Sequence, residues 1–246
     1  MAIVNSLQEQ RFQNNMAKHE IKARLERLQE RVAAAAQACG RNPADITVVA
    51  VAKTVPVELI EEAIELGVGH VGENRVQEAS PKFERIGRKA TWHMVGHLQT
   101  NKVKRALEVF DVIQSVDTVR LGKAIGERAL AIGRVADVLL EVNTSGEESK
   151  FGFDPDDLVS GVEEMCTLES LRISGLMTVG PLVDKPEEAR GAFILLRELG
   201  RRISDLGFPN VDMSVLSMGM SGDFEVAIQE GATMIRVGTA IFGERR

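Results

Sequence analysis

The sequence of 246 residues contains no tyrosine, only two cysteines and no apolar run of membrane-spanning length. Cys39 and Cys166 are widely separated and belong to no CxxC or Cys/His spacing, which argues against a disulfide framework and a zinc site. Residues 8–11 read Gln-Glu-Gln-Arg, where a signal peptide would need its apolar stretch. We therefore expect a cytoplasmic protein without a membrane partner.

The charge balance argues against a nucleic-acid-binding protein. Acidic residues outnumber basic ones by 36 to 30, which gives a formal net charge of −6 and leaves no basic stripe for a nucleic acid. Apolar residues make up 44% of the chain, enough to fill a sizeable core. No repeat, low-complexity tract or linker divides the sequence. We predict one domain over residues 1–246.

From Ile46 onward, apolar runs of strand length alternate with segments of helical period. This alternation is typical of parallel strands joined by crossover helices. The candidate strands span residues 47–53, 70–73, 91–96, 112–116, 138–143, 173–179, 213–218 and 234–241. Eight such units in about 250 residues predict an α/β fold of the TIM (β/α)8 barrel type. A doubly wound open sheet is the alternative.

An additional helix is predicted before the first strand, with one apolar face formed by Ile21, Leu25, Leu28, Val32 and Ala35 or Ala36. The chain ends soon after the eighth strand, so the usual last crossover helix is expected to be missing. We expect the N-terminal helix to pack over that gap.

Lys53 follows the apolar run of residues 46–52, where a buried strand meets a loop. Desolvation at the mouth of a parallel barrel disfavours the charged form of an amine and makes it a usable nucleophile. The plainer interpretation is a surface lysine whose stem packs on apolar neighbours while its amine stays in water.

The late part of the chain supplies residues suited to a phosphate. Ser217, Gly219, Ser221 and Gly222 follow the seventh strand, and Gly238-Thr239 lie at the end of the eighth. Barrel enzymes bind phosphates in this region, and the eighth strand neighbours the first when the barrel closes. Lys53 and these residues together indicate a phosphorylated aldehyde held covalently, although helix capping alone would also explain the serines and glycines.

Arg236 lies inside an otherwise apolar strand, and a buried arginine needs a partner. An ion pair with Glu141 or Glu73 is the structural alternative to a role in the site. His93 and His97 flank a predicted strand end, and we expect them to line the barrel mouth rather than bind a metal. No metal site is predicted.

The loop of residues 143–152 follows the fifth strand and could gate the site or contact bound amines. An exposed polar loop is the alternative interpretation.

Five motifs carry a resemblance to a known family. They read AVAKT at 50–54, GENRVQE at 72–78, WHMVGHLQTNK at 92–102, LSMGMS at 216–221 and IRVGTAIFG at 235–243. Over residues 46–243 the chain resembles the pyridoxal phosphate homeostasis proteins, which are similar to the barrel domain of alanine racemase, a fold type III pyridoxal phosphate protein. The resemblance agrees with the barrel predicted from periodicity.

The resemblance implies that Lys53 forms an aldimine with pyridoxal 5′-phosphate. It also implies that Asn74 lies beside the cofactor and that Arg236 faces the pyridine nitrogen. Ser217, Met218, Gly238 and Thr239 complete the implied cofactor-binding set, with Ser217, Gly238 and Thr239 at the phosphate.

The absence of tyrosine gains meaning beside this family. Alanine-racemase-like enzymes place a lysine on one face of the cofactor and a tyrosine from a second domain and subunit on the other. This chain lacks the tyrosine and that domain. We expect a monomeric carrier and regulator of pyridoxal phosphate and not an enzyme. The carrier is expected to exchange the cofactor with amines, amino acids or apo-enzymes. A weak racemase or lyase is the alternative, and a cofactor-free Schiff-base aldolase on phosphosugars is a third possibility.

Overall fold

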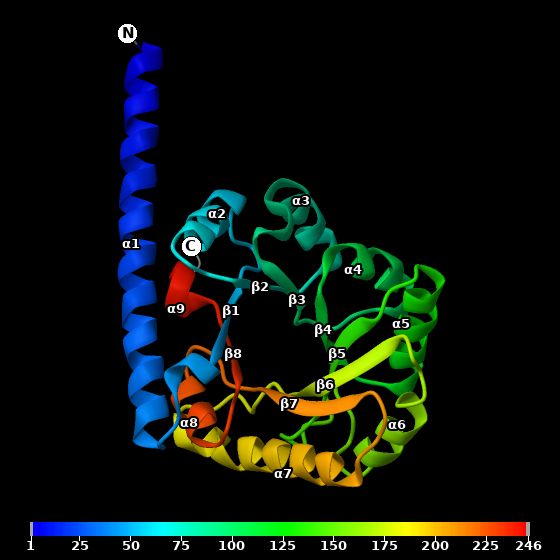
Figure 1. The fold of residues 1–246 in the computed structure, drawn as a ribbon. Coiled ribbons are helices and arrows are strands. Elements are labelled where there is room, and N and C mark those ends of the chain that lie inside the picture. Colours follow the sequence, from blue (N-terminus) through cyan, green and yellow to red (C-terminus); the bar gives the residue numbers. More distant parts are fainter. Residues whose placement is uncertain (1, 245–246) are drawn as a thin grey trace.

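In the computed structural model, which describes residues 2–244 and the side chains from His19 onward, parallel strands close into a barrel in chain order (Figure 1). The strands are β1 (Thr47–Val51), β2 (His70–Glu73), β3 (Thr91–Met94), β4 (Val112–Val116), β5 (Ala136–Glu141), β6 (Leu171–Met177), β7 (Val211–Ser217) and β8 (Met234–Val237). Ala50 of β1 is paired with Val237 of β8, so the first and last strands are neighbours. The predicted barrel is confirmed, and the open-sheet alternative is wrong.

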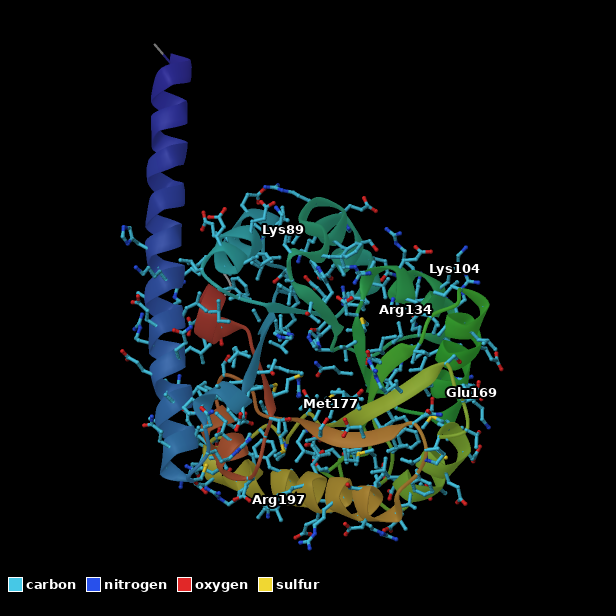
Figure 2. All side chains as sticks on the ribbon, in the orientation of Figure 1. Lys89, Lys104, Arg134, Glu169, Met177 and Arg197 are labelled. Atoms are coloured by element: carbon cyan, nitrogen blue, oxygen red, sulfur yellow. The ribbon has the colours of Figure 1, made fainter. Side chains whose placement is uncertain are left out.

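Helices surround the barrel. They are α1 (Ala2–Ala38), α2 (Val57–Glu65), α3 (Val76–Ile86), α4 (Val103–Val109), α5 (Val119–Ala131), α6 (Leu158–Met165), α7 (Arg190–Leu206), α8 (Phe224–Gln229) and α9 (Thr239–Phe242), with short 3-10 turns at Pro43–Asp45, Gly87–Lys89, Thr100–Lys102 and Pro186–Ala189. Figure 2 shows Met177 inside the ring of strands and Arg197 outside it, on α7. None of the helices in the described part of the chain has both the length and the apolarity needed to cross a membrane.

Strands such as β5 and β8 are buried on both faces, which explains their nearly continuous apolar runs, whereas Asp212 and Ser214 of β7 are exposed. In β5, Val138, Leu139 and Leu140 are consecutive and all buried. Successive side chains of a strand point to opposite faces, so one face of β5 meets the helices and the other fills the barrel. This double burial favours the parallel barrel over a sheet with a solvated face.

The N-terminal helix covers the seam between β8 and β1. From His19 onward, α1 buries Ile21, Leu25, Leu28 and Val32 and packs against α2, α8 and α9. The first part of α1 extends past the barrel (Figure 1). The predicted packing of this helix is confirmed. The helix that follows β8, α9, has only 4 residues, and α1 covers the seam.

Several strands end earlier than predicted. β1 ends at Val51 and β8 at Val237, so Lys53 lies in a turn and Thr239 begins a helix. The apolar runs extended too far because Ala52 and Val142, which directly follow the last residues of β1 and β5, are still buried and their amides still donate to the neighbouring strands. The correction moves Lys53, Gly238 and Thr239 out of the strands and onto the loops at the carboxyl mouth of the barrel, whereas Ser217 and Arg236 remain in β7 and β8.

Candidate functional site

A cavity of about 340 Å³ opens at the carboxyl mouth, beside the seam between β1 and β8. Lys53, Asn74, Arg236, Gly238 and Thr239 all line it, so closure of the barrel brings most of the predicted site residues together. The rest of the lining is formed by Val51, Val95, Val179, Met220, Ser221 and Gly222. The site therefore combines residues from the two ends of the barrel sequence.

Lys53 is carried by a strained turn. The following residue, Thr54, has a φ of 62°, in the left-handed region that β-branched residues rarely occupy. Such conformations cost about 1–3 kcal/mol and persist only where the surroundings hold them. The amide of Val55 donates to the carbonyl of Ala52 over 3.0 Å and closes the turn. A half-buried amine is thus presented to the cavity by a turn with a restricted backbone.

A second lysine fixes the ends of β1 and β2 to each other. Lys82 of α3 donates from Nζ to the carbonyl of Ala52 over 2.8 Å and to Oε1 of Glu73 over 2.6 Å. Ala52 and Glu73 directly precede Lys53 and Asn74, so this contact sets the positions of two lining residues. Burial raises the pKa of the Glu73 carboxyl, while Lys82 acts in the opposite direction. Sequence reasoning missed Lys82 because a helical lysine ordinarily faces solvent.

Two glycines allow the loops of the mouth to approach closely. A Cβ atom on Gly96 would lie 2.5 Å from the carbonyl oxygen of Asn74, a distance that no side chain tolerates. A Cβ atom on Gly238 would lie 3.1 Å from the carbonyl oxygen of Val51. Gly96 therefore permits the position of Asn74, and Gly238 permits the close approach of the loop after β8 to the end of β1.

Arg236 forms the polar base of the cavity. The residue is 5% exposed, and its guanidinium donates to Oγ of Ser217 and to the carbonyl of Thr178, each over 2.7 Å. Burial lowers the pKa of Arg236 to about 10, and the charges of Glu141 and Asp223 oppose this effect. The side chain remains a cation at neutral pH.

The ion-pair alternative for Arg236 is wrong. Glu73 pairs with Lys82, and Glu141 acts on Arg236 only through its field, since no carboxylate in residues 19–244 lies within ion-pair distance of the guanidinium.

Ser217 and Met218 lie deeper than the cavity lining. The fully buried hydroxyl of Ser217 donates to Oε1 of Gln114 over 2.7 Å and accepts from Arg236. The amide of Met218 donates to the carbonyl of Met234 over 3.0 Å. Ser221 supplies the hydroxyl in the lining, and its Oγ accepts from the amide of Ala240. The motif at 216–221 predicted this loop, but it could not show which of its two serines lines the cavity.

The two histidines occupy different environments. His93 is 1% exposed inside the barrel, between Nδ1 of His70 at 3.0 Å and Nε2 of Gln114 at 2.9 Å. Burial, followed by the effect of His70, lowers the pKa of His93 to about 3. Its predicted place at the mouth is therefore wrong. His97 does lie there, in a neighbouring cavity of about 670 Å³ that shares Asn74 with the first.

The loop after β5 contacts His97 rather than the Lys53 cavity. The ring of Phe151 stacks on the His97 ring with 3.9 Å between their centres, and Nδ1 of His97 lies 2.9 Å from Oδ2 of Asp117. Lys150 donates to the carbonyl of Gly180 over 3.1 Å, which joins this loop to the one after β6.

Among the described residues, no group of His, Cys, Asp and Glu side chains is placed to hold a metal ion.

The cavity is equipped for carbonyl chemistry on an anionic compound. Its lining includes one primary amine, from Lys53, and one arginine, together with the hydroxyl residues Ser221 and Thr239 and the half-buried Gly238. An amine can condense with an aldehyde, and hydroxyl and backbone donors beside a glycine suit a phosphate.

Comparisons with known proteins agree with this arrangement. The model of the alanine racemase N-terminal domain family matches residues 23–246. The pyridoxal phosphate homeostasis protein of Aquifex aeolicus is 43% identical over 224 residues, which cover 91% of this chain and 97% of that protein. The corresponding protein of Pseudomonas aeruginosa is 41% identical over 216 residues, which cover 87% and 91% of the two chains.

Solved structures show the same relationship. PipY of Synechococcus elongatus with pyridoxal phosphate bound superposes with a TM-score of 0.80 at 36% identity and covers 91% of this chain and 100% of its own. Alanine racemase of Clostridium difficile, at 15% identity, shares the fold with a TM-score of 0.74 over 92% of this chain and 57% of its own. The chain belongs to the alanine racemase N-terminal domain family and, within it, to the pyridoxal phosphate homeostasis proteins.

Proposed function

We propose that this protein binds pyridoxal 5′-phosphate covalently through Lys53 and maintains the supply of this cofactor in the cell, with little turnover of its own. The observation that carries the proposal is the shared cavity of Lys53, Arg236, Gly238 and Thr239. The names of the relatives and the bound cofactor in PipY support it. Amines, amino acids and apo-enzymes are the proposed recipients.

The residues present fit the cofactor. The aldehyde carbon would form a double bond to Nζ of Lys53, and the carbonyl oxygen would leave as water. Ser221, Gly238 and Thr239 are the proposed phosphate contacts, with Ser217 and Met218 as a supporting layer beneath them. Each hydrogen bond to the charged phosphate contributes about 1.5–3 kcal/mol, so this part of the site would supply much of the affinity.

Arg236 favours storage of the cofactor over catalysis. Pyridoxal phosphate, when bound to an enzyme, withdraws electrons from an amino acid through a protonated ring nitrogen. A guanidinium only donates hydrogen bonds, so it leaves a facing ring nitrogen unprotonated. We assign Arg236 to this nitrogen and Asn74 to the side of the cofactor.

The open site also favours a carrier. The sequence has no tyrosine to act as a second acid. We propose that this carrier is a monomer. The alternative is a weak amino-acid racemase or lyase, supported by the shared barrel. Sustained turnover of an amino acid by the purified protein would favour that alternative.

The proposed covalent bond is tested by absorption spectroscopy of the protein incubated with pyridoxal phosphate. We expect a near-visible band that borohydride abolishes, with the reduced adduct on the Lys53 peptide. Lys53→Ala should lack both, whereas Lys89→Ala, a change at an exposed lysine, should retain them. An adduct elsewhere, or a protein that stays colourless, would contradict the proposal. A colourless protein in which borohydride traps a sugar phosphate would instead indicate a cofactor-free aldolase.

A further inference from the structure

A chain of polar side chains crosses the interior of the barrel from the base of the cavity to the opposite mouth. Arg236 Nη1 contacts Ser217 Oγ at 2.7 Å, and Ser217 Oγ contacts Gln114 Oε1 at 2.7 Å. Gln114 Nε2 lies 2.9 Å from His93 Nδ1, and His93 Nε2 lies 3.0 Å from His70 Nδ1. The members come from β8, β7, β4, β3 and β2, so the chain connects five of the strands.

The burial of this chain makes its hydrogen bonds obligatory. Ser217 and Gln114 are fully buried, and His93 and Arg236 are nearly so. TIM barrel interiors are ordinarily filled by branched apolar side chains, and a buried polar group without a partner costs about 1–3 kcal/mol. Four buried polar side chains in succession therefore stabilise one arrangement only if every link is made.

The donor and acceptor ends of the Gln114 amide fix the direction in which the hydrogen bonds of this polar chain run. Arg236 can only donate, so Ser217 accepts from it and turns its own proton toward Gln114. Gln114 must then present its oxygen to Ser217 and its amide nitrogen to His93. His93 accepts at Nδ1, carries its proton on Nε2 and donates to Nδ1 of His70.

We propose that Gln114 is a positioning residue of the cofactor site, which acts through this directed chain to hold Ser217 and Arg236 beneath the cofactor. The inference rests on the proposed function, because it assigns Arg236 to the cofactor ring. Gln114 contacts no part of the cavity lining except through Ser217. Its loss would leave the Ser217 hydroxyl without its acceptor, and the guanidinium would lose a fixed partner.

The direction of the chain is tested on the cofactor-free protein by nitrogen-15 NMR of the histidine rings near pH 8. The protein has 4 histidines, so each signal can be assigned by single substitution. We expect the proton of His93 and of His70 on Nε2. His97 serves as an internal control, since its Nδ1 faces Asp117 and should carry a proton. A proton on Nδ1 of His93 would overturn the proposed direction whether or not the protein binds pyridoxal phosphate.

The positioning role is tested with Gln114→Met, which keeps the approximate volume and removes the hydrogen bonds of Gln114 to Ser217, to His93 and to the sulfur of Met234. Met177→Leu, another change inside the barrel, is the matched control (Figure 2). We expect Gln114→Met to release pyridoxal phosphate at least tenfold faster and to shift the pH profile of the near-visible band, with neither effect in the control. Equal release rates and pH profiles in the two variants would overturn the proposal. If Gln114→Met does not fold, the NMR measurement on the unaltered protein still decides.

Discussion

Lys53 and Lys82 lie near the same barrel mouth but have different surroundings. Lys82 is held by a carboxylate at 2.6 Å and a carbonyl at 2.8 Å, with its side chain 13% exposed. An amine whose protons are donated to a carboxylate and a carbonyl is a poor nucleophile. Lys53 lies in a turn that opens into the cavity. Position on the barrel, not residue type, separates the proposed reactive amine from the structural one.

Lys82→Met should lower the free energy of unfolding by about 3 kcal/mol, because it leaves Glu73 buried without its charged partner. Urea denaturation measures the change. The double variant Lys82→Met/Glu73→Gln should recover part of the loss, because an amide costs less to bury than a charge. Lys89→Met is the control for removing a lysine. Stability equal to that of the unaltered protein would show that the pair does not stabilise the fold.

Glu141 predicts a pH dependence of stability. Burial raises the pKa of its carboxyl from 4.5 to about 7, despite the opposing charge of Arg236. The unfolded chain ionises first, so the favourable contribution is present below pH 4.5 and is lost as the pH rises to about 7.

Glu141→Gln removes this titration. Relative to the original protein, the variant should gain about 3 kcal/mol between pH 5 and pH 8, by the equivalence of pKa shift and free energy. Denaturation of both proteins at the two pH values isolates the effect, since the other groups cancel in the difference. A constant difference across this range would contradict the raised pKa of Glu141.

At the scale of elements, α1 closes the part of the barrel surface where the sheet begins and ends. It packs against helices that follow β1, β7 and β8, and so covers both sides of the seam. The cavity opens at this seam. The packing of α1 should therefore stabilise the same region that holds Lys53 and Gly238.

Leu28→Ala should destabilise the protein by about 3 kcal/mol, because Leu28 is 2% exposed and its loss leaves a cavity between α1 and the barrel. Glu30→Ala, an exposed change on the same helix, should stay within about 0.5 kcal/mol of the original. Thermal or urea unfolding compares the two. Equal midpoints would mean that α1 contributes little to the closure of the barrel.

For the whole molecule, strand and helix periodicity was sufficient to predict the closed barrel, because parallel strands buried on both faces leave a strong apolar signal. The same signal misplaced strand ends such as that of β1, because Ala52 is buried although it follows the last strand residue, Val51. Boundaries depend on hydrogen bonding, which apolar content does not report.

Site residues were predictable where their place on the barrel brings them to the cavity. Residues whose role depends on a single side-chain contact were not predictable. Lys53, Gly238 and Thr239 share a cavity because they follow neighbouring strands. Gln114 and Lys82 gave no signal, since one polar residue in a strand or one lysine on a helix has many ordinary explanations. Their roles depend on partners distant in the sequence, such as Ser217 and Glu73.

The meeting of β1 and β8 has a consequence for synthesis of the protein on the ribosome. Lys53 emerges early, whereas Arg236, Gly238 and Thr239 emerge among the last residues. A nascent chain that lacks β8 carries the proposed reactive amine without these three residues of its cavity. Stable capture of a ligand must therefore follow completion of the chain, and a retained ligand marks a molecule whose first and last strands have joined.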